Sequence, residues 1–205
     1  ISVLLKEIKL RKNYLEEESV ETIYFGGGTP SVLTGSQLNK ILSFVHEEFQ
    51  IQKQAEITFE ANPDDLSVDY LRSLNHSGVN RLSIGIQALQ NTHLEKMNRR
   101  HNQEQAVHSV ENAVKAGFSN ISVDLIYGLP NLTRIQWKDS LQQVFSLPVQ
   151  HLSAYHLTYH QGTPFYTWLK KGTLKELDED ESIEQFNILT TEAERAGFEQ
   201  YEISN

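Results

Sequence analysis

The stretch "TIYFGGGTP", Thr22 to Pro30, joins four strand-forming residues to three glycines, a threonine and a proline. β-Branched and aromatic residues such as those of Thr22–Phe25 favour a strand, which glycine and proline then end. Because the glycines leave the main chain without Cβ shielding, its N–H and C=O groups can contact a ligand directly. The stretch predicts a strand followed by a ligand-binding loop, with a plain strand-to-loop turn as the alternative.

Further runs of this kind alternate with amphipathic segments along the chain, about thirty residues apart, which is the spacing of successive βαβ units. This alternation predicts an α/β fold with a parallel sheet. The strands are too few for a closed eight-fold barrel, so a partial (β/α)6 TIM-like barrel fits better than a doubly wound sheet. The expected strands are Thr22–Phe25, Ile57–Phe59, Arg81–Ile86, Ile121–Ile126, Leu152–Leu157 and Gln200–Ile203.

Helix signals lie between these runs. Thr34 with Gln37 and Thr133 with Gln136 have the spacing of capping boxes, and glycines at 117 and 197 are placed to end helices. Residues 1 to 17 read as a helix with no strand before it. The apolar stripes expected to face the core are Leu38, Ile41, Leu42, Val45 and Phe49; Ala106, Val107, Val110, Ala113 and Val114; Ile135, Leu141, Val144 and Phe145; and Ile183, Phe186, Leu189, Ala193 and Ala196.

The composition excludes several classes of protein. The 205 residues are expected to form one domain, 1–205, with a net charge of -9, which argues against binding to a nucleic-acid backbone. No apolar run is long enough to span a bilayer, and no signal peptide opens the chain. The absence of cysteine excludes disulfides and thiolate-held metals, and it favours a cytoplasmic location.

Polar residues stand at the carboxyl ends of the expected strands, where parallel α/β folds bind ligands. Glu60 follows a strand and needs a partner if buried, either a ligand or Arg81 in a salt bridge. Gln87 offers a donor and an acceptor, or caps a helix. Asp124 lies between apolar residues, where a ligand or backbone amides would satisfy it. Arg99 is either an exposed arginine or a bidentate clamp for a carboxylate.

The motifs "GGGTP", "EANP", "RLSIGIQ" and "DLIYGLP", in this order, resemble those of the radical S-adenosylmethionine enzymes. Within that family the chain is most similar to oxygen-independent coproporphyrinogen III oxidase and the related heme chaperone. The resemblance covers Val20 to Asn205. It implies a partial barrel with S-adenosylmethionine across the strand ends.

The resemblance also implies the roles of the site residues. The backbone of Gly27, Gly28 and Thr29 would meet the methionyl amino group. Four side chains would contact the ribose and the methionyl carboxylate, namely those of Glu60, Gln87, Arg99 and Asp124. The family further uses a four-iron four-sulfur cluster held by a cysteine triad. Because this chain begins with Ile1 and has no cysteine, we expect a fragment that lacks the first strand, the cluster loop and a C-terminal domain, with a cysteine-free homologue as the alternative.

The sequence leaves three functions open. "RRH", Arg99–His101, matches the R-x-H pattern of the chaperone, and the region from His151 to Tyr166 also resembles the chaperone. The expected partners are then a tetrapyrrole, heme or coproporphyrinogen, and a heme-accepting protein, with heme as a further ligand. The second function is the oxidase itself, in which a 5′-deoxyadenosyl radical attacks a propionate side chain. The third is a barrel enzyme that binds a phosphate on the glycine loop without radical chemistry.

Overall fold

A computed structural model describes residues 1–14 and 19–202. The strands are β1 (Ser19–Phe25), β2 (Gln50–Ala61), β3 (Arg81–Gln87), β4 (Ile121–Tyr127) and β5 (His151–His156). The α-helices are α1 (Ser2–Leu10), α2 (Gly35–Glu48), α3 (Val68–His76), α4 (Asn91–Lys96), α5 (Gln103–Lys115), α6 (Arg134–Ser146), α7 (Pro164–Lys170) and α8 (Glu179–Arg195). Short 3-10 turns are η1 (Lys12–Tyr14), η2 (Pro30–Val32) and η3 (Pro63–Asp65).

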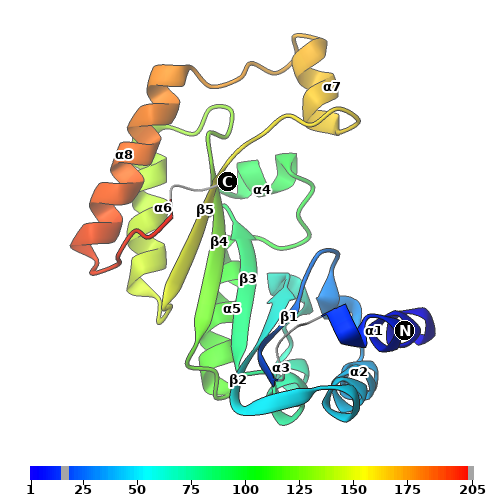
Figure 1. The fold of residues 1–205 in the computed structure, drawn as a ribbon. Helices are drawn as coiled ribbons and strands as arrows, with labels where there is room; N and C mark the ends of the chain where they lie inside the picture. Colours follow the sequence, from blue (N-terminus) through cyan, green and yellow to red (C-terminus); the bar gives the residue numbers. More distant parts are fainter. Residues whose placement is uncertain (15–18, 203–205) are drawn as a thin grey trace.

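The described strands form one parallel sheet in the order β1-β2-β3-β4-β5. The sheet curves into a half-barrel, and the carboxyl ends of its strands point toward α4 and α7 (Figure 1). The expected α/β fold with a partial barrel of parallel strands is therefore confirmed.

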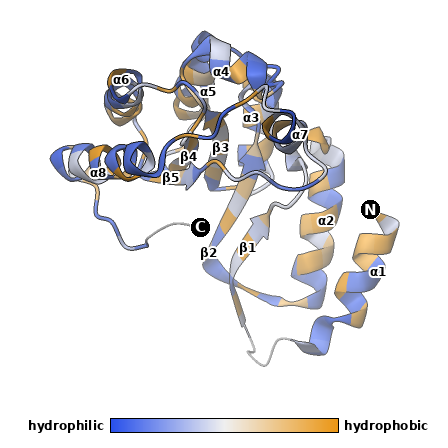
Figure 2. Ribbon diagram, turned by 90° about the horizontal axis from the view of Figure 1, so that it is seen from above, coloured by the Kyte–Doolittle hydropathy of each residue, from blue (hydrophilic) through white to orange (hydrophobic). Residues whose placement is uncertain are grey.

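The two faces of the sheet differ in chemistry. Apolar side chains of β2, β3 and β4, among them Phe59, Ile84 and Val123, are fully buried in the core. Their neighbours along the strands, such as Glu60, Ser83 and Asp124, point the other way because strand side chains alternate. Viewed along the strands, α2, α5 and α6 lie outside the curved sheet, and no described helix covers its inner side (Figure 2). The core thus forms on the outside and a polar surface lines the inside.

Helix ends follow the signals read from the sequence. The capping boxes of Thr34 with Gln37 and of Thr133 with Gln136 are both present. Gly117 and Gly197 have φ angles of +99° and +83°, in the left-handed region that lets a helix end without steric cost. None of the helices within the described ranges is long and apolar enough to cross a membrane.

Three expectations about the elements were wrong. Four residues of the expected core stripes are exposed, namely Ile135 at 75%, Ile183 at 52%, Val114 at 40% and Ala196. All four lie near an end of their helix, where fewer neighbouring side chains cover it. Residues 200 to 202 do not form the expected sixth strand, and Ile203 lies outside the described residues. The first helix ends at Leu10 rather than near residue 17, and residues 15 to 17 also lie outside the described ranges.

Helix α8 holds the loop that follows β4. The side chain of Gln185 is fully buried, accepts a hydrogen bond from Gly128 N at 2.9 Å and donates one to Leu132 O at 2.9 Å. The Gln185 carbonyl accepts from the indole nitrogen of the buried Trp137 at 2.8 Å. One glutamine therefore fixes the "YGLP" loop between the sheet and two helices.

Candidate functional site

The glycine loop leaves β1 at Gly26 and lies against the end of β2. A Cβ at Gly26 would lie 2.5 Å from Tyr24 Cε1 and 2.8 Å from Glu60 Oε1, so any other residue there would displace these two side chains. Cβ atoms at Gly27 and Gly28 would meet no atom within 4 Å, and Gly27 has a φ of +94°. The backbone at Gly27 and Gly28 is therefore not shielded by neighbouring side chains, and a ligand could approach it.

Glu60 is held against this loop by two donors. Tyr24 donates its hydroxyl hydrogen to Glu60 Oε1 at 2.8 Å, and Gly27 N donates to Glu60 Oε2 at 3.3 Å. Burial and the Glu60 carboxylate raise the pKa of Tyr24 to about 12, so the phenol stays protonated and keeps donating. The alternative salt bridge to Arg81 is not formed, because Arg81 Nη1 lies 3.4 Å from Glu56 Oε1 instead.

Asp124 lies on the polar face of β4, and β3 separates it from Glu60 on β2. Ser83 on β3 donates its hydroxyl hydrogen to Asp124 Oδ1 at 3.3 Å. Burial, with a smaller contribution from the Glu60 charge, raises the pKa of Asp124 from 3.8 to about 6, and the Ser83 hydrogen bond opposes this shift. Asp124 is thus a desolvated carboxylate whose ionised form gains from any donor that a ligand brings.

Gln87 and Arg99 approach the same point on β3. A Cβ at Gly85 would lie 2.6 Å from Gln87 Nε2 and 3.7 Å from Arg99 Nη2, which explains the glycine within this strand. Gln87 adopts a φ of +70°, which is uncommon for a residue with a side chain. Backbone strain of this kind clusters at ligand clamps and active sites.

The Arg99 guanidinium makes no hydrogen bond or salt bridge to any residue that the structure describes. Burial lowers the pKa of Arg99, whereas the charges of Asp64 and Asp124 raise it. An arginine remains protonated in proteins, so this half-buried cation has donors to offer and no fixed acceptor. It is suited to a ligand carboxylate.

A second layer of charges connects the surrounding loops. Ser31, just after the glycine loop, donates to Asp65 Oδ2 at 2.6 Å. Arg100 Nη2 lies 2.7 Å from Asp64 Oδ2 and 2.8 Å from Asp65 Oδ1. His101 is buried, with its Nε2 3.0 Å from Ile86 O and its Nδ1 3.6 Å from Asp64 Oδ1.

The structure therefore gathers the predicted residues at one edge of the sheet. Glu60 touches the glycine loop, the charges of Glu60 and Arg99 reach Asp124, and Gln87 and Arg99 flank Gly85. Tyr24, Ser83 and the acidic pair Asp64 and Asp65 also belong to this site and were not predicted from the sequence. The pair was readable as "DD" directly after "EANP", whereas nothing local distinguishes Tyr24 from any strand tyrosine.

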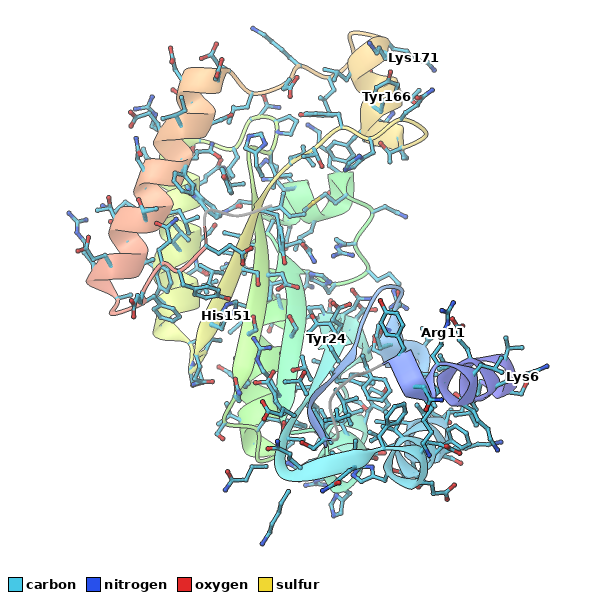
Figure 3. All side chains as sticks on the ribbon, in the orientation of Figure 1. Lys6, Arg11, Tyr24, His151, Tyr166 and Lys171 are labelled. Atoms are coloured by element: carbon cyan, nitrogen blue, oxygen red, sulfur yellow. The ribbon has the colours of Figure 1, made fainter. Side chains whose placement is uncertain are left out.

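The histidines near β5 have separate partners. His151 contacts Ser122 Oγ at 2.8 Å and Tyr201 Oη at 2.7 Å, His156 contacts Ser182 Oγ at 3.1 Å, and His160 contacts Thr158 Oγ1 at 2.8 Å. Within residues 1–14 and 19–202, no group of three histidine, cysteine or acidic side chains could hold a metal ion. Figure 3 shows His151 on β5 and Tyr24 on β1, on opposite sides of the sheet's inner surface.

A groove with a volume of about 570 Å³ runs along β5 and α8, where His151, Ser153 and Tyr201 contribute to its lining. None of the predicted site residues lines it. The candidate site therefore lies at the strand ends, where the Arg99 guanidinium, unpaired among the described residues, the Glu60 and Asp124 carboxylates and the exposed glycine loop come together outside this groove.

Known proteins with similar sequences point to one family. The profile of the radical SAM superfamily matches residues 2–144. The chain is 38% identical over 190 residues to "Heme chaperone HemW" of Lactococcus lactis, an alignment that covers 93% of this chain and 50% of that protein. It is 36% identical over 188 residues to "Radical S-adenosyl methionine domain-containing protein 1, mitochondrial" of Mus musculus, covering 92% and 42%. The chain spans about half the length of these curated relatives.

A solved structure with a similar fold belongs to the same family. Coproporphyrinogen III oxidase (HemN) from Escherichia coli, described as a radical SAM enzyme, superposes with a TM-score of 0.83 and 25% identity, over 97% of this chain and 45% of that one. The motifs, the half-barrel, the sequence relatives and the superfamily profile agree, and the chain belongs to the radical SAM superfamily.

Proposed function

We propose that this chain binds S-adenosylmethionine at the carboxyl edge of the sheet, as part of a heme chaperone. The observation that carries the proposal is the half-buried Arg99 guanidinium, which has no acceptor among the described residues and lies beside Gln87 at the same sheet edge as the open glycine loop. A zwitterionic amino acid end with a sugar attached matches these groups in charge and polarity.

Each part of the ligand has a complementary group. The methionyl carboxylate would accept hydrogen bonds from Arg99, because bidentate guanidinium–carboxylate pairs are the strongest contact available there. The methionyl ammonium would lie against the peptide groups of Gly27 to Thr29 and the carboxylate of Glu60. Gln87 and Asp124 would receive the ribose hydroxyls, which would add donors to those that Ser83 and Ser153 already offer to the desolvated Asp124 carboxylate.

The iron–sulfur cluster of the family does not fit the residues at hand. The chain has no cysteine, and its described residues contain no alternative metal-ligand group. In the family, the cluster and S-adenosylmethionine together supply radical chemistry. This chain's own residues would bind and orient S-adenosylmethionine, and the ligands of the cluster would have to come from elsewhere.

The assignment to the chaperone rests on the relatives and on one local motif. Relatives named heme chaperone align with more than nine-tenths of this chain. His101 of the "RRH" motif is buried and fixes the loop that carries Arg99. The ligand of the whole protein would then be heme, its partner a heme-accepting protein, and residues 1–205 the S-adenosylmethionine-binding core.

Calorimetric titration with S-adenosylmethionine tests the first part of this proposal. We expect Arg99→Ala to weaken binding about 10- to 100-fold, because hydrogen bonds to charged groups contribute about 1.5–3 kcal/mol. Arg72→Ala, at an exposed arginine of α3, is the matched control and should bind like the wild type. Equal affinity of wild type and Arg99→Ala would reject the site.

The oxidase is the second candidate, favoured by the close superposition on coproporphyrinogen III oxidase. The protein as its gene encodes it should be reconstituted anaerobically with iron and sulfide and then given hemin or coproporphyrinogen. A chaperone binds hemin stably and leaves the propionates of coproporphyrinogen intact. Release of carbon dioxide from coproporphyrinogen would identify the oxidase. The phosphate-binding alternative predicts that inorganic phosphate competes with S-adenosylmethionine.

A further inference from the structure

Two neighbouring arginines, Arg99 and Arg100, have opposite environments. Arg99 is partly buried, and its guanidinium makes no hydrogen bond or salt bridge among the described residues. Arg100 has a side chain that is 64% exposed, yet its Nη2 atom lies within 2.8 Å of both Asp64 and Asp65. The exposed Arg100 is thus held by two salt bridges, whereas the partly buried Arg99 forms none with the described residues.

The acidic pair would attract any nearby cation. The side chains of Asp64 and Asp65 are only 15% and 16% exposed, so little water screens their charges. Ser31 donates one hydrogen bond to Asp65, and His101 lies 3.6 Å from Asp64 with a pKa that burial lowers, so it adds little positive charge. Arg100 is therefore the main cation that neutralises the pair.

Arg99 is a second cation on which the acidic pair acts. The charge of Asp64 acts on Arg99 and raises its pKa against the effect of burial. The Arg99 side chain is long and has no fixed hydrogen bond, so its guanidinium could turn toward Asp64 if Arg100 were absent. A carboxylate on the same chain competes at a high effective concentration with a ligand that arrives from solution.

We propose that Arg100 is a positioning residue that occupies Asp64 and Asp65 and so keeps the Arg99 guanidinium available for the carboxylate of the bound ligand. This inference rests on the proposed binding of S-adenosylmethionine. Arg100 itself does not touch the ligand. Its role is electrostatic competition within the protein, and the role of the acidic pair is to anchor the loop that follows β2 to Ser31 and Arg100.

Whether removal of the acidic pair restores ligand affinity to an Arg100 variant distinguishes this role from a merely structural one. Arg100→Gln removes the charge and exposes the acidic pair to Arg99, so S-adenosylmethionine should bind about 10-fold more weakly, which corresponds to the loss of one charged contact. Asp64→Asn and Asp65→Asn, added to Arg100→Gln, remove the competing charges. Because asparagine still accepts the hydrogen bond from Ser31, the triple variant should recover affinity to within about 3-fold of the wild type.

The experiment is calorimetric titration of the gene-encoded protein with S-adenosylmethionine, with thermal melts to verify folding. Arg72→Gln, at another exposed arginine that pairs with an aspartate on α3, is the control and should bind like the wild type. Should Arg100→Gln fail to fold, Arg100→Lys replaces it. Arg100→Lys keeps the positive charge, so its affinity for S-adenosylmethionine should stay within about 3-fold of the wild type. The double variant Arg100→Lys with Arg99→Ala should bind more weakly than that.

Two results would overturn this inference but leave the proposed function intact, provided that wild type and Arg99→Ala still differ in affinity for S-adenosylmethionine. One is unchanged affinity in Arg100→Gln. The other is a triple variant that stays as weak as Arg100→Gln, since a lost structural tie cannot be restored by removing more charges. If the wild type does not bind S-adenosylmethionine at all, the proposed function fails and the inference falls with it.

Discussion

Tyr24 on the edge strand β1 donates its hydroxyl hydrogen to Glu60 on β2 at 2.8 Å, and Gly27 N donates to the other carboxylate oxygen at 3.3 Å. The two donors hold the Glu60 carboxylate beside the glycine loop, on the side where the peptide groups are open. Tyr24 therefore acts on the proposed site through Glu60 and needs no contact with the ligand.

Tyr24→Phe should weaken S-adenosylmethionine binding by about 3-fold, at the low end of a hydrogen bond's contribution, because Tyr24 is 57% exposed and water can replace it. Titration calorimetry of Tyr24→Phe beside Tyr14→Phe, an exposed tyrosine of η1, measures this. A loss as large as that of Arg99→Ala would mean that Tyr24 contacts the ligand directly.

Gly26→Ala should lower the free energy of unfolding by about 1–3 kcal/mol, because the new methyl group would overlap Tyr24 and Glu60 and force both side chains to shift. Gly28→Ala is the matched control, since its methyl group would meet open space. Urea unfolding of the two variants measures this difference in stability. Equal stability would show that the Tyr24 and Glu60 side chains move aside without cost.

Asp124→Asn should change how stability depends on pH. The pKa of Asp124 rises from 3.8 to about 6 on folding, so the folded state holds its proton more tightly. The wild type should therefore lose stability relative to Asp124→Asn as the pH rises from about 4 to 6, by on the order of 2–3 kcal/mol. Above about pH 6 the difference should stay constant. Urea unfolding of both proteins at pH 4, 5, 6 and 8 measures it, and parallel curves would mean that Asp124 is not desolvated.

Gln185→Leu should destabilise the fold by about 2–4 kcal/mol, because it leaves the buried Gly128 N–H and Leu132 C=O without partners. The exposed Gln161 provides the control variant Gln161→Leu, which should change stability by less than about 0.5 kcal/mol. Hydrogen exchange should also become faster in the loop after β4. A stable variant with unchanged exchange would contradict the role given to Gln185.

The sequence predicted the parallel sheet and the positions of Glu60 and Asp124 on it, whereas their role in binding stays a prediction. Glu60 was singled out because it follows a strand, and Asp124 because it is an acid between apolar residues. The Asp64, Asp65 and Arg100 cluster could not be derived in this way, because Asp65 and Arg100 lie 35 positions apart and meet only through the fold. The burial of Ile135 and Ile183 was misjudged because helical periodicity gives the face on which a residue lies, but not how much of that face the rest of the fold covers near a helix end.

The alternating faces of β2, β3 and β4 also limit how homologous sequences can diverge. Deleting one residue within β2 before Glu60 would reverse the directions of its side chains, so that Phe59 would enter the binding edge and Glu60 would face the helices. Insertions and deletions among relatives of this chain should therefore accumulate in the turns that precede the strands, while the distance from the start of each strand to its carboxyl-end polar residue stays constant.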